Sequence, residues 1–296
     1  MTFQQLQYLL EVNRSNSIRK AAAKLFVAPS SISACVNSLE EELGFPIFIR
    51  TQKGLSPTPQ GQSILDYAQR ICNIYEKMVN VQNDAPTPVR ISCFDYAPPC
   101  IAFARLAEAM QDQKNLAPRL VNLSLTQTIQ KLTACELEVG TIAHFSMKSQ
   151  LLEAQLQDAD LRWQALATIP YAAVVGPSHP LHGAKSITIR ELAAYTLIDT
   201  SAKIYSTELL SQFMKTVPEH VLPVGNILAR RETTLRGVGY SIELMPPRSI
   251  RKTDALHYIP IEGLSATFYA VTNPQNPATA SAEHYIKLLK EELNKI

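Results

Sequence analysis

Several common signatures are missing from this chain of 296 residues. Charged residues make up only 18% of it and hydrophobic residues 46%, so the sequence is too apolar for a disordered protein and long enough for two or three compact units. No stretch approaches the roughly 18 consecutive apolar residues that a membrane-spanning helix needs. Its first residues also lack the basic start and the small-residue cleavage site of a signal peptide. We therefore expect a cytoplasmic protein without a membrane partner.

Motifs for catalysis and metal binding are missing as well. The five cysteines are odd in number and include no C-x-x-C pair, and the six histidines form neither an H-E-x-x-H motif nor a cluster with cysteine. There is no G-x-S-x-G elbow and no Walker loop, and no G-x-G-x-x-G follows a strand. We predict no enzyme, no metal site and no cofactor, and we expect reduced, buried thiols. A redox switch between Cys93 and Cys100 stays open as an alternative.

The net charge of +2 gives little sign of a nucleic-acid partner. Nine basic residues face seven acidic ones in residues 1–90, whereas nineteen face nineteen in the remainder. A DNA-binding surface would therefore have to be local, and its prediction depends on the pattern of residues.

The first 60 residues predict three short helices and a hairpin. Apolar residues at helical spacing predict helices over about 3–13, 18–25 and 29–43. Ser17 is a candidate N-cap, Pro29 occupies a favoured first helical position, and Gly44 ends the third helix. Residues 45–50 and 54–57 then predict the two strands of a hairpin. A hairpin directly after a helix-turn-helix is typical of a winged helix-turn-helix, which we assign to residues 1–60.

A long helix follows from Thr58, with Pro59 at its first position and Gly61 as its weak point, to about residue 82. One apolar stripe runs along it. This stripe either packs on the chain's own head or pairs with the same helix of a second subunit, and we favour the second because a head of about 60 residues cannot cover the whole helix. Residues 61–87 are therefore assigned as a linker for dimerisation.

Beyond a proline-containing linker at 83–88, strands and helices alternate. We predict strands at 89–93, 120–125, 137–143, 171–175, 196–198, 240–244, 256–259 and 267–271, and helices at 100–110, 126–134, 206–217, 227–236 and 279–293. Such alternation predicts parallel sheets covered by helices, which is an α/β architecture.

Residues 3 to about 70 resemble the N-terminal domain of LysR-type transcriptional regulators. The matching segments are Leu6-Gln-Tyr-Leu, Ser17-Ile-Arg-Lys-Ala-Ala22, Ser30-Ser-Ile-Ser33, Leu39-Glu-Glu-Glu-Leu-Gly44, Phe48-Ile-Arg-Thr51, Lys53-Gly54, Thr58 and Gly61. The body is similar to the same family at Cys135-Glu-Leu-Glu-Val-Gly-Thr-Ile142, at Pro177-Ser-His-Pro-Leu181 and at Arg236-Gly-Val-Gly-Tyr240.

The resemblance implies a transcription regulator rather than an enzyme. It implies a body of two periplasmic-binding-protein-like α/β subdomains, one of residues 88–160 plus 268–296 and one of residues 161–267, with a cleft for a small-molecule effector between them. It also implies a homo-oligomer, a dimer through the linker helix and a tetramer through the bodies, that binds double-stranded promoter DNA. The chemical identity of the effector stays open.

The third helix would enter the major groove with short polar side chains at its N-terminal end. The candidate DNA-binding residues are Ser17, Pro29, Ser30, Ser31, Ser33, Ala34, Asn37, Arg50, Thr51 and Lys53. Two of them depart from the family pattern, because Pro29 stands where glutamine is usual and Ala34 where arginine often follows the serine. Losing one bidentate base contact removes about 1–3 kcal/mol of discrimination. Our hypothesis is that a single head reads sequence weakly and depends on DNA shape, phosphates and several heads.

Effectors of open α/β sheets lie at the carboxyl ends of strands, so residues that follow predicted strands are the candidates. They are Asp95, Tyr96, Thr126, Gln127, Thr200 and Ser201, and Asn226 is added as the expected N-cap of the helix at 227–236. Tyr96 replaces the usual Ser or Thr, and Asp95 precedes it, so carboxylate binding does not carry over simply from the family. Arg230 and Arg231 are interpreted as a solvated helix face. The alternative class is a solute-binding module without DNA function, which would share the body but lack the winged head.

Overall fold

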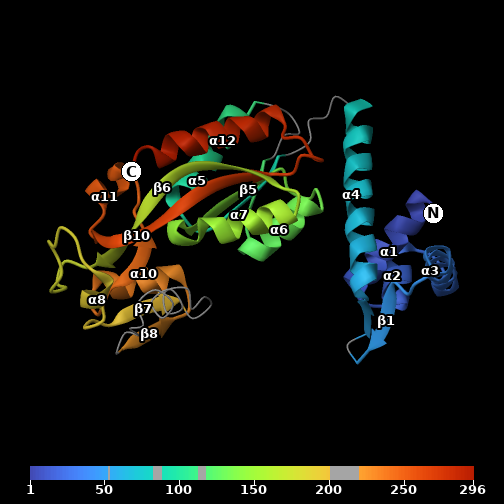
Figure 1. Ribbon diagram of the computed structural model, residues 1–296, viewed down its shortest axis with the longest axis horizontal. Helices are drawn as coiled ribbons and strands as arrows, with labels where there is room; N and C mark the ends of the chain where they lie inside the picture. Colours follow the sequence, from blue (N-terminus) through green and yellow to red (C-terminus); the bar gives the residue numbers. More distant parts are fainter. Residues whose placement is uncertain (53, 83–88, 113–117, 201–219) are drawn as a thin grey trace.

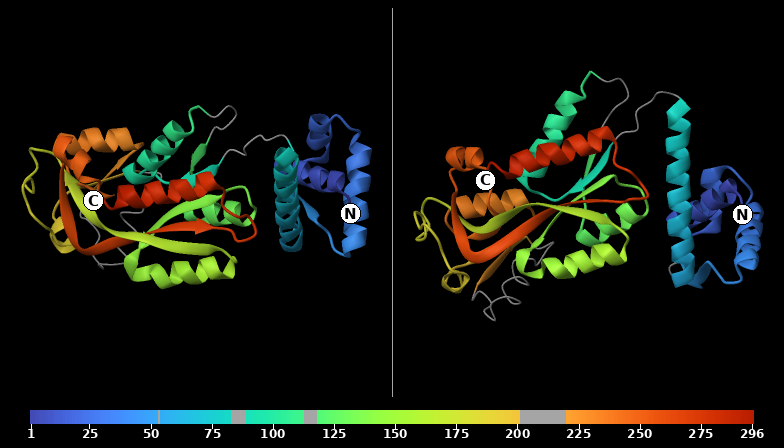
Figure 2. Two further views of the ribbon diagram at one scale, coloured as in Figure 1. Left: turned by 90° about the horizontal axis from the view of Figure 1, so that it is seen from above. Right: turned by 45° about the horizontal axis from the view of Figure 1, so that its top comes forward.

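A computed structural model describes residues 1–52, 54–82, 89–112, 118–200 and 220–296 (Figure 1). Lys53, Ser201 and the helix expected at 206–217 lie outside the described residues. The described part divides into a helical head at the N-terminus, a long helix beside it, and an α/β body (Figures 1 and 2).

The head begins with helices α1 (Phe3–Ser15), α2 (Ile18–Leu25) and α3 (Pro29–Leu43). Side-chain caps set two of the starts, since Thr2 forms a capping box with Gln5 before α1, and Ser17 accepts a hydrogen bond from the Lys20 amide before α2. The helices end at residues in the left-handed conformation, among them Gly44 after α3. The predicted helix-turn-helix is therefore confirmed, with α1 two residues longer than expected.

The wing consists of strands β1 (Phe48–Thr51) and β2 (Gly54–Pro57), which pair antiparallel. A carboxylate fixes the start of β1, because Glu40 Oε1 accepts hydrogen bonds from the amides of Ile47 (2.7 Å) and Phe48 (3.1 Å). Glu40 in the acidic run of α3 therefore has a structural use. The wing is joined to the core of the head at a defined angle.

Helix α4 (Pro59–Gln82) begins where the sequence predicts. Thr58 Oγ1 accepts from the Gly61 amide at 2.9 Å and donates to the Pro46 carbonyl at 2.7 Å. Gly61, expected as a weak point of this helix, also has a packing role. A Cβ at this position would lie 2.0 Å from the Ile47 carbonyl oxygen, so glycine is what permits the close approach of α4 to the wing.

The body is built on a six-stranded sheet in the order β4-β3-β5-β10-β6-β9. The strands are β3 (Arg90–Cys93), β4 (Arg119–Asn122), β5 (Val139–Phe145), β6 (Arg162–Val175), β9 (Ser241–Leu244) and β10 (His257–Thr272). The expectation of parallel sheets is only partly right, since β3 is parallel to β4 and β5, but β10 is antiparallel to β5 and β6, and β6 to β9. The sheet is mixed because β10 lies between β5 and β6 and runs in the direction opposite to both.

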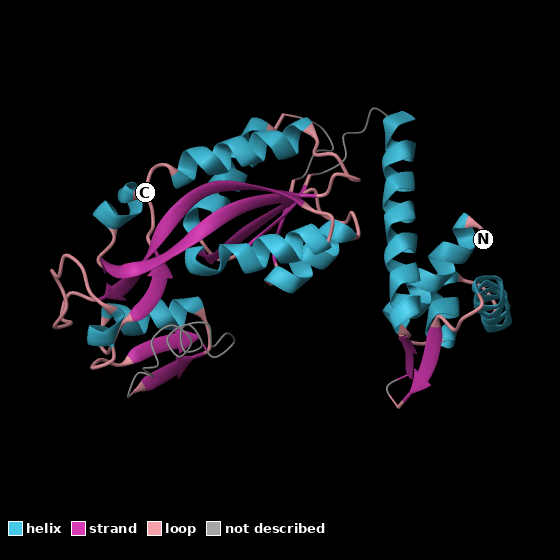
Figure 3. Ribbon diagram, in the orientation of Figure 1, coloured by secondary structure: helices cyan, strands magenta, loops and turns pink. Residues whose placement is uncertain are grey.

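Strands β6 and β10 are much longer than predicted and run through the whole body (Figure 3). The two strands expected at 256–259 and 267–271 are one strand. Pairing of β10 with β6 shifts between Pro260 and Ser265, opposite Tyr171, and then resumes. This irregularity contains Gly263 in the left-handed conformation, which explains why the sequence there resembles a turn.

Two lobes share these long strands. In the first lobe α5 (Ala97–Ala109) and α12 (Ala280–Leu293) cover one face of the sheet, and α6 (Leu125–Thr133) and α7 (Ser149–Asp158) cover the other (Figure 1). The second lobe adds a parallel pair, β7 (Leu197–Thr200) and β8 (Val221–Val224), with α8 (Ile189–Leu192), α10 (Ile227–Leu235) and α11 (Arg248–Thr253). A short 3-10 turn, η1 (Ser146–Lys148), links β5 to α7. We expected the chain to pass from one lobe to the other after residues 160 and 267. The first of these limits falls just before β6, and the second lies within β10.

Candidate DNA-binding surface and ligand cavity

Helix α3 has one buried and one exposed face. Ile32, Val36 and Leu39 are buried in the core of the head. Four candidate residues on the opposite side are exposed and one is half-buried; the exposed ones are Ser30, Ser31, Ala34 and Asn37, and the half-buried one is Ser33. The N-terminal half of α3 thus presents hydroxyls and one amide, the side chains that exchange hydrogen bonds with base edges and phosphates.

The start of α3 has the departure expected from the sequence. Ala28 is the N-cap residue and makes no side-chain hydrogen bond, while Pro29 occupies the first turn. No side chain therefore caps this end of the helix, but Pro29 has no backbone N–H and the Ser31 amide donates to the Ala28 carbonyl at 3.0 Å. A DNA phosphate at this end would find few free amides and would depend mainly on the serine hydroxyls.

The flanking candidates lie at the start of α2 and in the wing. Ser17 caps α2, beside exposed Arg19 and Lys20. In the wing, Arg50 is exposed, and Thr51 Oγ1 donates to the Gly54 carbonyl at 2.9 Å, which closes the hairpin. The structure brings the basic side chains of α2 and of the wing together with α3 on one small domain.

One exposed aromatic residue in the head was missed. Phe26 lies in the turn between α2 and α3, has φ of 55° and is 95% exposed. A bulky residue in the left-handed conformation costs backbone energy, and an apolar ring in water adds to that cost. The signal in the sequence was an apolar residue at the turn, outside the helical period.

The linker helix packs on its own head in part, and its pairing with a second subunit stays a prediction. One face of α4 packs on the head through Leu65, Ala68 and Cys72. Another face is apolar and exposed; its residues are Tyr67, Ile71, Ile74 and Met78, whereas Tyr75 packs its ring on Phe3 of the head at 4.3 Å between centroids. The helix also contacts the body, where Asn73 Nδ2 donates to the Ala134 carbonyl at 2.8 Å and Arg70 donates to Gln275 at 3.1 Å. Packing on the head therefore leaves a second apolar face for another partner.

A cavity of about 800 Å³ lies between the two lobes of the body. It is bounded by the ends of β3 and β5, the starts of α6 and α10, and strands β6, β7 and β9. Its lining residues include Phe94, Asp95, Tyr96, Ser124, Leu125, Thr128, Thr141, His144, Phe145, Tyr171, Asp199, Thr200, Asn226, Leu228, Arg230 and Glu243.

Four of the predicted effector residues line this cavity, namely Asp95, Tyr96, Thr200 and Asn226. Thr126 and Gln127 lie outside the lining. Helix α6 starts at Leu125, one residue earlier than expected, so Gln127 closes the capping box with Ser124 instead. Asn226 is the N-cap of α10, as predicted, and accepts from the Ala229 amide at 2.9 Å.

Aromatic rings form much of the cavity wall, and of the four only Tyr96 was a candidate from the sequence. The rings of Phe94 and Tyr96 stack at 6.0 Å between centroids, and those of Phe145 and Tyr171 at 5.4 Å. Tyr96 is also held in place by its hydroxyl, which donates to the Met245 carbonyl at 2.5 Å. Aromatic residues after strands are indistinguishable from core residues in a single sequence, which is why the other three were missed.

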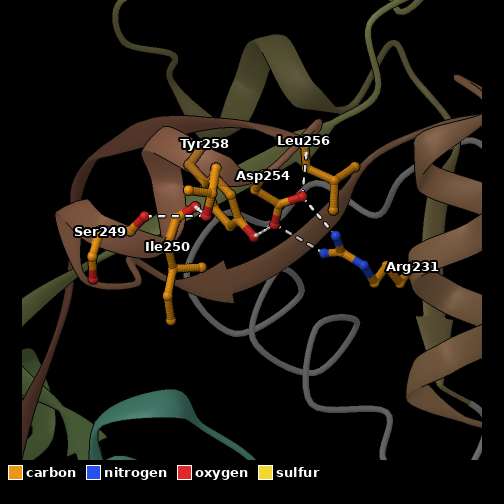
Figure 4. Close-up of polar contacts among 7 residues, drawn as sticks. Arg231, Ser249, Ile250, Asp254, Leu256 and Tyr258 are labelled. Atoms are coloured by element: carbon orange, nitrogen blue, oxygen red, sulfur yellow. Dashed lines mark hydrogen bonds and ion pairs between the residues drawn. The ribbon is translucent and has the colours of Figure 1, made fainter.

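The interpretation of Arg230 and Arg231 as a solvated helix face is wrong for Arg230, whereas Arg231 is 43% exposed but paired. Arg230 faces the cavity and pairs with Glu243 at 3.1 Å, with only 17% of its side chain exposed. Arg231 donates to both oxygens of Asp254, at 2.9 and 2.6 Å, and Tyr258 donates to the same carboxylate (Figure 4). Burial raises the pKa of Asp254, but these hydrogen bonds outweigh it and lower that pKa to about 2.

The cysteines do not all fit the expectation of buried thiols. Cys72, Cys93 and Cys135 are buried, but Cys100 in the first turns of α5 is exposed. A hydrogen bond between Cys93 and Cys100 raises the pKa of Cys93 and lowers that of Cys100 to about 6. All five are free thiols.

The winged head, the linker helix and the two-lobed body with a cavity define the class of proteins that join a DNA-recognition domain to a ligand-binding domain. Residues 3–62 match the bacterial regulatory helix-turn-helix proteins of the lysR family, and residues 83–294 match the LysR substrate binding domain. The chain therefore belongs to the LysR family. None of the described helices is long and apolar enough to cross a membrane.

Individual relatives agree with this placement. The chain is 26% identical over 185 residues to the HTH-type transcriptional regulator GltR of Bacillus subtilis, covering 61% of this chain and 59% of GltR, so it spans about three-fifths of that relative. Full-length OxyR from Pseudomonas aeruginosa has a TM-score of 0.67 at 18% identity, with 98% of both chains covered. Full-length CbnR solved with its target DNA has a TM-score of 0.59 at 16% identity, covering 99% of this chain and 100% of CbnR.

Proposed function

We propose that this protein is a cytoplasmic transcription regulator that binds double-stranded promoter DNA as an oligomer and responds to a small molecule in the cavity between its lobes. The observation that carries the proposal is the exposed polar face of α3, with the serine hydroxyls at its N-terminal end and the adjacent wing. The neighbour CbnR has been solved with its target DNA, which supports the same use of the head here.

The proposed oligomer uses the exposed apolar face of α4. Large apolar side chains such as Ile74 and Met78 are 44% and 64% exposed, and together with Tyr67 and Ile71 they form a stripe along one helix. Pairing of two such stripes removes this surface from water and places two heads side by side. A further association of bodies gives the tetramer implied by the family.

The test is DNA binding by purified full-length protein. A selection from genomic fragments identifies a site, and fluorescence anisotropy measures affinity for it at increasing salt. We expect the affinity to fall steeply, by about 10³-fold or more between 50 and 200 mM salt if the oligomer makes six or more phosphate contacts. Asn37→Ala and Ser31→Ala weaken binding, whereas Gln111→Ala, an exposed change in the body, does not.

The hypothesis of weak readout by one head is tested with the same site. Base substitutions in one half-site are expected to cost little in affinity as long as the oligomer is intact. Large losses at several positions of one half-site would contradict this hypothesis. Salt-independent binding, or binding unaffected by the changes in α3, would contradict the proposed function itself.

A further inference from the structure

The described lining of the cavity carries more negative than positive charge. Its acidic residues are Asp95, Asp199 and Glu243, and its only arginine among the described residues is Arg230, which already pairs with Glu243. Burial lowers the pKa of His144, so this imidazole is neutral at neutral pH. Its Nδ1 is buried and has no hydrogen-bond partner in the described part of the chain. The described part of the lining thus offers carboxylates and a neutral ring nitrogen rather than a free cation.

The helix N-termini at the cavity are poor anion sites. At the start of α5, Pro98 and Pro99 occupy the first turn and have no backbone N–H to donate. At α6 the Ser124 and Gln127 side chains already cap the helix, and at α10 the Asn226 side chain does so. Donors that an anion normally uses at such ends are therefore removed by proline or shared with a cap.

Among the three carboxylates, Asp95 has the most freedom to meet a ligand. Asp199 is nearly buried and accepts a hydrogen bond from the Thr200 amide at 2.8 Å, while Glu243 accepts from Arg230 and from Ser241. Asp95 is exposed and lies between the aromatic residues Phe94 and Tyr96. A positive group beside it would gain a counter-charge without displacing an existing ion pair.

The aromatic rings of the cavity wall also favour a ligand with a positive group. Phe94, Tyr96, Phe145 and Tyr171 all line the cavity, in two stacked pairs. Such rings bind the apolar body of a ligand by burial, and their faces attract cations. An anion would meet both the carboxylates and the negative faces of these rings.

We propose that the effector carries a positive charge, as an amine on an apolar or aromatic body, with Asp95 as its counter-charge and the four rings around its body. This inference rests on the proposed function, because it names the class of ligand for the same cavity. The proposed ligand is thus a cation, whereas a carboxylate ligand would be an anion.

The experiment uses three probes with one aromatic body and different head groups: 2-phenylethylamine, phenylacetate and 2-phenylethanol. Isothermal titration calorimetry on the full-length protein without DNA measures the affinity of each at neutral pH. We expect the amine to bind at least about tenfold more tightly than phenylacetate, the scale of one partly screened ion pair. Asp95→Asn should remove most of the advantage of the amine and leave 2-phenylethanol unchanged.

Asp112→Asn, an exposed aspartate after α5 that is not part of the lining, is the matched control and should leave all three affinities unchanged. Tighter binding of phenylacetate, no binding of the amine, or an amine affinity unaffected by Asp95→Asn would each overturn the inference. DNA binding is measured without any probe, so a failure of the charge preference is distinguishable from a failure of the proposed function.

Discussion

The ion pair between Arg231 and Asp254 allows a quantitative prediction about the stability of the second lobe. It joins α10, which borders the cavity, to the segment before β10. The carboxylate also accepts hydrogen bonds from the Tyr258 hydroxyl at 2.7 Å and from the Leu256 amide at 3.2 Å. The change to test is Asp254→Asn, which keeps the shape of the side chain and removes its charge.

The magnitude follows from the pKa of Asp254, about 2 against an ordinary value of 3.8. At about 1.36 kcal/mol per pKa unit this difference corresponds to roughly 2.4 kcal/mol of stabilisation at neutral pH. The Arg231 side chain is 43% exposed, so solvent screens part of the interaction. We expect Asp254→Asn to lower the free energy of unfolding by about 1 to 2 kcal/mol at pH 7.

Urea unfolding measures this loss through the fluorescence of Trp163, the single tryptophan, which lies in β6 of the body. Because folding lowers the pKa of Asp254, its stabilisation is complete above the ordinary value and disappears as the pH falls toward 2. About half of the difference between wild type and variant should be gone at pH 3. A difference that stays constant from pH 7 to 3, or one no larger than that of Asp112→Asn, would refute the reasoning.

Two further predictions concern a glycine and a thiol. Gly61→Ala places a methyl group against the Ile47 carbonyl and should destabilise the head by about 2 kcal/mol or more. We expect faster hydrogen exchange of the α4 amides in this variant and unchanged exchange in the control variant Gln62→Ala. Equal exchange in both variants would contradict the steric argument. The rate at which iodoacetamide alkylates Cys100, followed by peptide mass spectrometry, should rise with pH with a midpoint near pH 6. Cys93→Ala should move this midpoint to higher pH. A wild-type midpoint near the usual thiol pKa of about 8.5 would contradict the assigned hydrogen bond.

The head could be predicted almost residue by residue because its signals are local. Helical spacing located the three helices, Ser17 and Pro29 marked two starts, and Gly44 marked an end. Phe26 was missed, and the packing role of Gly61 was not predicted. Its role depends on a carbonyl fourteen residues earlier in the chain, and helical propensity alone does not contain that contact.

The body was harder to predict because its decisive contacts are between distant segments. Local pattern gave most strands but not the antiparallel return of β10, nor its continuity through an irregular stretch. The rule that ligands lie after strands and at helix N-termini selected four lining residues. It could not select the other three rings of the cavity wall or Arg230, since a single sequence does not separate a ring in a core from a ring in a cavity, nor a solvated arginine from a paired one.

The shift in pairing opposite Tyr171 bears on how the two lobes can move. The core of the first lobe includes Ile169 and Ala172, and that of the second begins at Ala173, so the shift lies where the two cores meet. No flexible linker separates the lobes there; two continuous strands cross the junction, and their ladder of hydrogen bonds is interrupted at that level. Relative motion of the two lobes is then a bend or twist of this two-stranded ribbon at the level where its pairing is interrupted. Tyr171 faces the cavity from that point, so a ligand that packs on its ring would stiffen the ribbon where it yields most easily.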